Sequence, residues 1–245
     1  MRLNSIRVGE KYITNQGCTS TIFEYFRWDN CSVIFEDGNI LKNVRYADLK
    51  KGSIKNPFHL SVCGIGYLGI GNYSSAINHR HWYSMLNRCY NLTLHKERPT
   101  YKECLVSKKW ECFQNFAEWH EENYNPKIME GWALDKDILL KGNKIYSPET
   151  CCFVPQEINA LFIKHQNARG KYPIGVIKKG NKYEARVNKN GYRESQGLFD
   201  TPEEAFEAYK IAKEEYIKEV ADSWREQITE QTYQAMYAYE VEITD

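Results

Sequence analysis

Three short segments between residues 174 and 199 constrain the fold of this chain more than any other feature. The dipeptides Gly180-Asn181 and Asn190-Gly191 separate them. Such dipeptides favour tight hairpin turns. The sequence therefore predicts three consecutive strands joined by hairpins, over residues 174–178, 183–188 and 192–199.

A helix start follows the third segment directly. Thr201 is a favoured N-cap residue, Pro202 suits the first helical position, and Glu204 completes a capping box. One face of the expected helix then carries Ala205, Ala208, Ala212, Tyr216 and Val220. Because the alanines are small, this face predicts a helix that lies close across the sheet.

Charge is distributed unevenly along the chain, although the net charge is only +1. Residues 169–200 carry 8 basic and 3 acidic side chains, a balance of +5, whereas residues 201–245 carry 4 and 12, a balance of −8. Residues 1–58 and 59–168 are closer to balance, at +3 and +1. A basic segment followed by an acidic one is typical of a phosphate-facing sheet backed by a solvent-facing helix.

The composition is that of a globular protein, with 42% hydrophobic and 27% charged residues among 245. That length allows one large domain or two to three small ones. The first residues, MRLNSIRVGEKYI, contain no apolar run with a cleavage site, and no 18-residue apolar span occurs. We therefore expect a cytoplasmic protein that has no membrane partner.

Eight cysteines are scattered through the chain, at positions 18, 31, 63, 89, 104, 112, 151 and 152. In a reducing compartment most of them are expected to be small buried side chains. Cys89, Cys104 and Cys112 could form a zinc cluster, but no C-x-x-C pair is present to nucleate it. A structural Zn²⁺ is therefore not expected.

The first 58 residues predict a small all-β module. Residues 19–26 and 31–35 are rich in β-branched and aromatic residues, and Asp37-Gly38 signals a hairpin before a further strand over residues 41–46. The polar run KKGSIKNP then marks a boundary.

Two helical patterns dominate the segment that follows. Trp82, Met85 and Cys89 form one apolar face. The second helix carries an aromatic stripe that predicts core packing: Trp110, Phe113, Phe116 and Trp119 or His120. His79 and His81 stand just before the first helix, and two surface histidines are favoured over a metal site, since their spacing suits a strand better than a helix.

The stretch LDKDILLKGNKIYSPETCCFVPQEINALF, residues 134–162, predicts a ββα unit. Strand character covers residues 132–139, and turn residues fill the loop at residues 142–150. A second short strand is expected at residues 151–154, and Pro155 opens a helix, where proline is tolerated in the first turn.

Three separated blocks of sequence resemble the HNH, or His-Me finger, nucleases, and most closely the branch found in phages and their mobile elements. The resemblance covers roughly residues 62–165. The matching residues are Trp82, Met85, Arg88 and Cys89; then Phe113, Phe116 and Trp119; then Leu134, Asp135, Lys136, Asn143, Tyr146, Ser147, Pro148, Glu149, Cys151 and Asn159.

The resemblance implies a site that holds one divalent ion against the scissile phosphate. Asp135 and Asn159 would supply oxygen ligands suited to Mg²⁺ or Mn²⁺. Lys136 stands where the family has a general-base histidine, and Thr150 stands where it has a loop-fixing asparagine. Asp137 is a rival base or second ligand, because alternate residues of a strand share a face with each other. A structural ββα unit with these acids on its surface is the competing interpretation.

The carboxy-terminal pattern resembles the Apetala-two, or ethylene-response-factor, type of DNA-binding domain over about residues 170–221. The matching residues are Gly175, Val176, Tyr183, Ala185, Arg186, Gly197, Phe199 and the helix TPEEAFEAY. The resemblance implies that the sheet lies in the DNA major groove and reads it with Lys178, Lys179, Lys182, Arg186, Lys189 and Arg193. Ile177 stands where plant members commonly carry arginine, so their sequence preference does not transfer. A charged exposed face without a DNA partner is the competing interpretation.

We therefore expect an α+β protein of three modules, at residues 1–58, 59–168 and 169–224, with a helical tail at residues 225–245. The expected function is that of a phage or mobile-element DNA endonuclease of the homing type, acting on double-stranded DNA in a bacterial host with Mg²⁺ or Mn²⁺. Two alternatives stay open: a DNA-binding regulator without cleavage activity, and a protein that binds a host factor through its β module.

Overall fold

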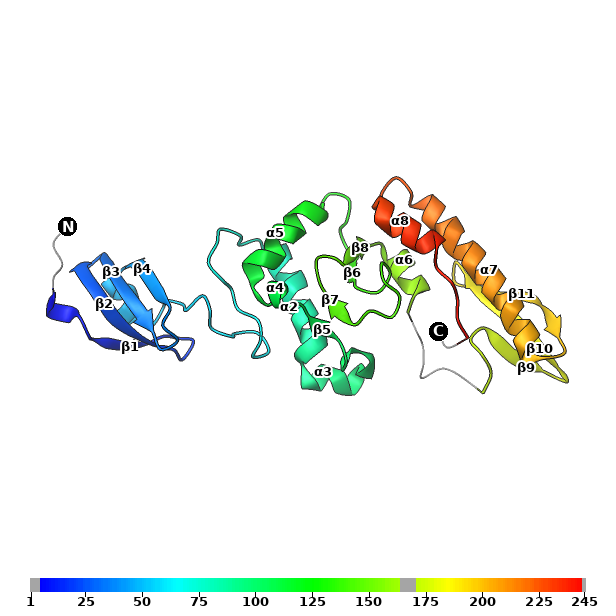
Figure 1. Cartoon of the computed structure of the whole chain (residues 1–245), viewed down its shortest axis with the longest axis horizontal. Helices are drawn as coiled ribbons and strands as arrows, with labels where there is room; N and C mark the ends of the chain where they lie inside the picture. Colours follow the sequence, from blue (N-terminus) through cyan, green and yellow to red (C-terminus); the bar gives the residue numbers. More distant parts are fainter. Residues whose placement is uncertain (1–4, 164–170, 244–245) are drawn as a thin grey trace. The chain divides into compact units, whose positions relative to one another are not determined.

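The computed structural model describes residues 5–163 and 171–243 (Figure 1). By its internal contacts the chain divides into two compact units. The first unit comprises residues 1–122 and the second unit residues 123–245. Both units mix helices with small antiparallel sheets, which confirms the α+β class. The predicted boundary between residues 168 and 169 lies outside the described residues. Within them, no helix is both long and apolar enough to span a bilayer.

The first unit begins with a four-stranded antiparallel sheet in the order β1-β2-β3-β4. Its core side chains include Ile22, Val33 and Leu49. The three predicted strands are confirmed, whereas the sequence missed β1 and the helix α1 that begins at Tyr46. The elements are a 3₁₀ helix Ser5–Arg7, β1 (Lys11–Ile13), β2 (Thr19–Arg27), β3 (Asn30–Phe35), β4 (Ile40–Val44) and α1 (Tyr46–Lys50).

The rest of the first unit is mainly helical. Trp82, Trp110 and Phe116 are completely buried, and Trp82 Nε1 donates to the backbone oxygen of Trp110 at 2.8 Å. Both predicted apolar faces therefore form one core. The elements are α2 (Ala76–Tyr90), α3 (Leu92–Glu97), a 3₁₀ helix Pro99–Tyr101, β5 (Leu105–Val106), α4 (Lys108–Glu111) and α5 (Phe113–Asn123).

The second unit opens with the expected ββα unit. β6 (Ala133–Asp135) pairs antiparallel with β8 (Cys152–Val154), and α6 (Gln156–Leu161) follows at once. β7 (Ile145–Tyr146) lies within the connecting loop. The first strand was predicted to reach residue 139 but ends at Asp135, where the chain turns.

A three-stranded antiparallel sheet follows in the order β11-β10-β9. Its strands are β9 (Val176–Lys179), β10 (Lys182–Lys189) and β11 (Tyr192–Phe199), which confirms the three predicted strands to within two residues. The helix α7 (Pro202–Ser223) packs on one face of this sheet, and its core includes Val187. The predicted capping box is present at its start.

Two contacts fix α7 in place. Gly175, at φ +76°, lets the backbone pass so close to α7 that an added Cβ would lie 2.0 Å from the Tyr209 ring. At the other end, α8 (Glu230–Tyr237) folds back on α7, where the hydroxyls of Tyr233 and Tyr237 donate to Asp222 at 2.8 and 2.6 Å. The predicted helical tail therefore docks on the body of its own chain.

Candidate functional sites

The face of the β9–β10–β11 sheet that α7 leaves uncovered gathers four of the six predicted DNA-binding residues. Along β10, Ala185 and Val187 are buried toward α7, so the even-numbered residues point to the other face. Cross-strand pairing adds Lys179, opposite Lys182, and Arg193, opposite Asn188. The uncovered face thus carries Lys179, Lys182, Arg186 and Arg193.

The other two predicted residues lie on the α7 side of the sheet. Lys178 pairs with Tyr183, which packs against the core under α7. Lys189 bonds to Glu219 of α7 at 3.3 Å and lies over the ring of Tyr216. Adjacent residues of a strand point in opposite directions, so Lys178 cannot share a face with Lys179.

Glu184 organises the centre of the uncovered face. Its Oε2 accepts from Arg186 Nε at 3.0 Å and Nη2 at 2.7 Å, and its Oε1 accepts from Ser195 Oγ at 2.7 Å. Lys179 Nζ lies 3.4 Å from Oε1. The Ser195 hydroxyl and the Arg186 guanidinium lower the pKa of Glu184 to about 2, so the carboxylate is ionised at neutral pH.

Apolar side chains flank this charged cluster. Ile177 and Leu198 stand opposite Glu184 on the two outer strands and are 38% and 50% exposed. Lys182, further along, pairs with Asp200 at 3.0 Å. Glu184 and Asp200 therefore neutralise part of the positive charge of this face. A count of lysines and arginines along the sequence could not show this.

Asp135 forms the turn that ends β6. Its Oδ1 accepts from the backbone nitrogens of Asp137 and Ile138, both at 2.8 Å, so the carboxylate bends the chain out of the strand. The expectation that Asp135 and Asp137 share a strand face is therefore wrong, although the two carboxylates remain neighbours. Burial, followed by the charge of Asp137, raises the pKa of Asp135 to about 6.

Lys136, at the general-base position, is part of an ion pair. Its side chain is buried, and Nζ lies 3.2 Å from Asp137 Oδ2 and 5.8 Å from the centre of the Tyr146 ring. An ammonium beside a carboxylate is favoured in its charged form. Lys136 is therefore better placed to stabilise negative charge than to accept a proton.

The loop between β6 and β8 is fixed chiefly by Asn143. Its Nδ2 donates to the backbone oxygens of Lys136 at 2.6 Å and Ile145 at 2.7 Å, and its Oδ1 accepts from the Ile145 nitrogen. Thr150, which stands at the position of the loop-fixing asparagine, donates to the same Ile145 oxygen at 3.0 Å. Asn143 thus makes the cross-loop hydrogen bonds that were expected of the residue at position 150.

The residues around Asp135 can be compared with the needs of a divalent ion. Asn159 is half-buried in α6, directly after β8, and Asp135 pairs with Cys152 of that strand. Within the described part of the chain, no three His, Cys, Asp or Glu side chains converge on a metal position. The crowded carboxylates of Asp135 and Asp137 nevertheless suit a hard cation that retains several waters and needs few protein ligands.

A histidine pair in the first unit was not predicted. His81 Nδ1 lies 2.8 Å from His120 Nε2, and His120 is 2% exposed. His79 and His81 both belong to α2 instead of preceding it, and His79 packs against the Trp82 and Phe113 rings. The pair joins residues 39 positions apart, so no local pattern could reveal it.

Comparison of the chain with protein-family models, curated proteins and solved structures finds no match. Functional inference therefore starts from the two arrangements described above. One is the basic uncovered face centred on Glu184 and Arg186. The other is the carboxylate turn at Asp135.

Proposed function

We propose that the protein binds duplex DNA through the uncovered face of the β9–β10–β11 sheet. The observation that carries this proposal is the convergence of Lys179, Lys182, Arg186 and Arg193 on one accessible face. Three strands span about 10 Å, from strand spacings of roughly 4.8 Å. The major groove is about 12 Å wide, so a sheet of this width can enter it.

The groups on this face divide between phosphate contact and base contact. Lys179, Lys182 and Arg193 are exposed and suited to phosphates. Arg186 donates from Nε and Nη2 to Glu184, and these two bonds orient its guanidinium. Neither bond uses Nη1. An oriented arginine is the commonest reader of guanine, and exposed Ile177 and Leu198 offer apolar contact to thymine methyl groups.

Adjacent lysines of β9 supply a matched test. Duplex affinity is measured by fluorescence anisotropy over a series of salt concentrations for wild type, Lys179→Ala and Lys178→Ala. Lys179→Ala should weaken binding and reduce the salt slope by about one unit for the lost phosphate contact. Lys178→Ala, on the α7 side, should bind nearly as wild type. Equal effects of the two substitutions, or none, would contradict the proposal.

Metal-dependent cleavage of the bound DNA is the second candidate function. The specific observation is the pair of neighbouring carboxylates, Asp135 and Asp137, with the Lys136 ammonium beside them. A divalent ion bound there would lower the pKa of its water and polarise the phosphate. Asp135 and Asn159 would hold it, and Lys136 would stabilise charge on the phosphate oxygens.

Nicking of supercoiled plasmid in Mg²⁺ or Mn²⁺ tests this second candidate. Asp135→Asn keeps an oxygen acceptor for the turn but removes the charge, and it should abolish nicking. Glu130→Gln removes an exposed charge just before β6, outside the residues that match the nuclease pattern, and serves as the control. If wild type and Asp135→Asn behave alike, the cleavage proposal fails and a non-cleaving DNA-binding regulator takes its place.

A further inference from the structure

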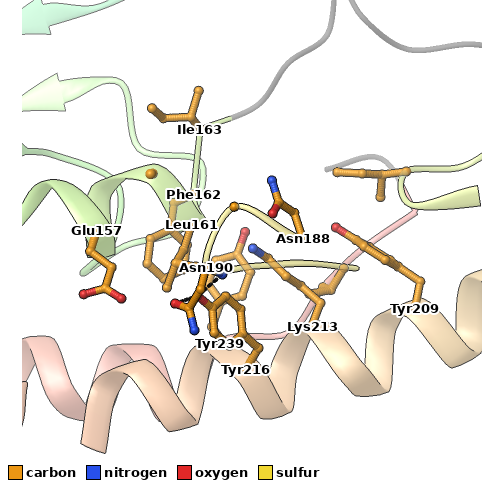
Figure 2. A pocket seen from close by; sticks show the side chains of 14 residues that line it. Glu157, Leu161, Phe162, Ile163, Asn188, Asn190, Tyr209, Lys213, Tyr216 and Tyr239 are labelled. Atoms are coloured by element: carbon orange, nitrogen blue, oxygen red, sulfur yellow. Dashed lines mark hydrogen bonds between the residues drawn. The ribbon is translucent and has the colours of Figure 1, made fainter. Parts of the chain in front are cut away.

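A cavity of about 360 Å³ lies in the second unit, apart from the residues assigned above to DNA contact and cleavage (Figure 2). Its walls come from the end of α6, Ile174 before β9, the end of β10 with the turn to β11, one side of α7 and the segment after α8. Cavities of this size accommodate small organic molecules.

The wall is mainly apolar and aromatic. Phe162, Tyr209, Tyr216 and Tyr239 all line it, together with aliphatic side chains. Phe162 and Tyr239 pack edge to face with ring centres 4.8 Å apart, and Tyr216 is fixed by a hydrogen bond from its hydroxyl to Asn190 Oδ1 at 3.0 Å. Rings held in this way form a preorganised surface for a planar aromatic ligand.

Lys213 is the one cation among the described residues that line the cavity. It extends from α7 toward the cavity and is half-buried (Figure 2). Among residues 5–163 and 171–243, no carboxylate lies within ion-pair distance of its ammonium. Burial lowers the pKa of Lys213 to about 8, since removing a cation from water without a counter-charge is costly.

The remaining titratable groups at the cavity limit the charge of a ligand. Glu157 lines the α6 side, and its Oε2 is already engaged by the indole nitrogen of Trp224 at 2.8 Å. The other titratable side chains among the described lining residues are those of Tyr209, Tyr216 and Tyr239. One ammonium opposed by one carboxylate favours a ligand with a single negative charge over a phosphate dianion.

We propose that this cavity binds a small planar aromatic carboxylate, with its ring against the tyrosines and its carboxylate paired with the ammonium of Lys213. The ligand supplies the counter-charge that the described residues do not. The site is independent of the proposed DNA contacts, so it can be tested without DNA.

2-Naphthoate is a suitable probe, because it is planar, singly charged and fluorescent. Titration of the full-length protein at pH 7 should give saturable binding of one equivalent. The neutral isostere 2-naphthamide should bind at least ten-fold more weakly, and acetate should not compete. Binding of 2-naphthoate should weaken between pH 7 and pH 10 as the Lys213 ammonium loses its proton.

Two substitutions on α7 separate a specific contact from general charge. Lys213→Met keeps the length of the side chain and should weaken 2-naphthoate binding at least ten-fold. Lys218→Met, at an exposed position of the same helix, should leave it unchanged. The circular dichroism of both variants should match that of wild type. Absent saturable binding, equal affinity for the acid and the amide, or an unaltered Lys213→Met variant would each overturn the proposal; the acid and amide comparison on wild type stands even if a variant misfolds.

Discussion

Arg186 and Glu184 stand two residues apart on β10, and the guanidinium Nη2 lies 2.7 Å from the carboxylate Oε2. Both side chains share the uncovered face of the sheet because a strand repeats every two residues. The carboxylate is almost fully buried beneath the basic side chains and Ser195. Glu184 therefore removes one unit of positive charge from the face but gives Arg186 a fixed direction.

Glu184→Gln tests this orienting role. Loss of the negative charge should preserve or strengthen binding to random duplex, while discrimination between a selected site and a scrambled one should fall. One good bidentate base contact accounts for about 1–3 kcal/mol of discrimination. The measurement is competition binding with a site selected from a random library. A variant that loses affinity for both duplexes equally would show that Glu184 does not orient a base contact.

Addition of Mg²⁺ should stabilise the wild-type protein but not Asp135→Asn. A ligand that binds only the folded state raises the melting temperature by mass action. Without metal, Asp135→Asn should melt above wild type, because the substitution removes a carboxylate that burial and Asp137 both oppose. Differential scanning fluorimetry with EDTA and then excess Mg²⁺ measures both effects. The same Mg²⁺ shift in both proteins would place the ion elsewhere.

The stability of the first unit should fall as the pH is lowered from about 6.5 to about 4. Burial, followed by the charge of His81, lowers the pKa of His120 to about 4. An unfolded histidine takes up its proton near pH 6.5, so the unfolded state binds more protons within this window. The stability is present in full above the window and is lost as pH falls, by up to about 3 kcal/mol.

His120→Gln isolates that contribution from other acid-sensitive groups. The variant has no titrating ring at this position, so its unfolding free energy should depend less on pH between 4 and 6.5 than that of wild type. Urea unfolding at several pH values, followed by tryptophan fluorescence, gives both slopes. Parallel pH profiles would mean that the buried histidine pair does not control this dependence.

Gly175→Ala should destabilise the second unit more than Gly180→Ala. Both glycines have positive φ, at +76° and +65°, so each substitution strains the backbone by about 1 kcal/mol. At Gly175 the new Cβ also meets the Tyr209 ring, whereas at Gly180 nothing lies within 4 Å. Overpacking of this kind adds about 1–3 kcal/mol. Denaturant unfolding of the two variants should show the difference, and equal losses would exclude the contact with α7 as its cause.

The sequence predicted best where the determinants are local. The strands of the β9–β10–β11 sheet and the Thr201 capping box follow from turn dipeptides and capping chemistry within a few residues. The end of β6 was predicted too late. The Asp135 side chain accepts hydrogen bonds from two backbone N–H groups and so ends the strand, but in the sequence the apolar residues that follow Asp135 are the stronger signal.

Two properties of the chain limited the prediction of the candidate sites: neighbouring strand residues point to opposite faces, and some partners lie far apart in the sequence. Treating all six basic residues as one surface ignored that Lys178 and Lys179 must diverge on a strand. The pairing of His81 with His120, and of Lys189 with Glu219, depends on packing between elements far apart in the chain. The cavity at Lys213 has the same origin, because its walls come from five separate segments.

Alternate positions of β10 have different structural roles. Substitution at Ala185 or Val187 would alter the packing under α7, whereas substitution at Lys182 or Arg186 would alter only the uncovered face. Under the proposed function, point mutations on the uncovered face would change the bound target without disturbing the core. A single-residue insertion in β10 would instead exchange the two sets of side chains, so that charged residues would face α7 and the core residues would face solvent.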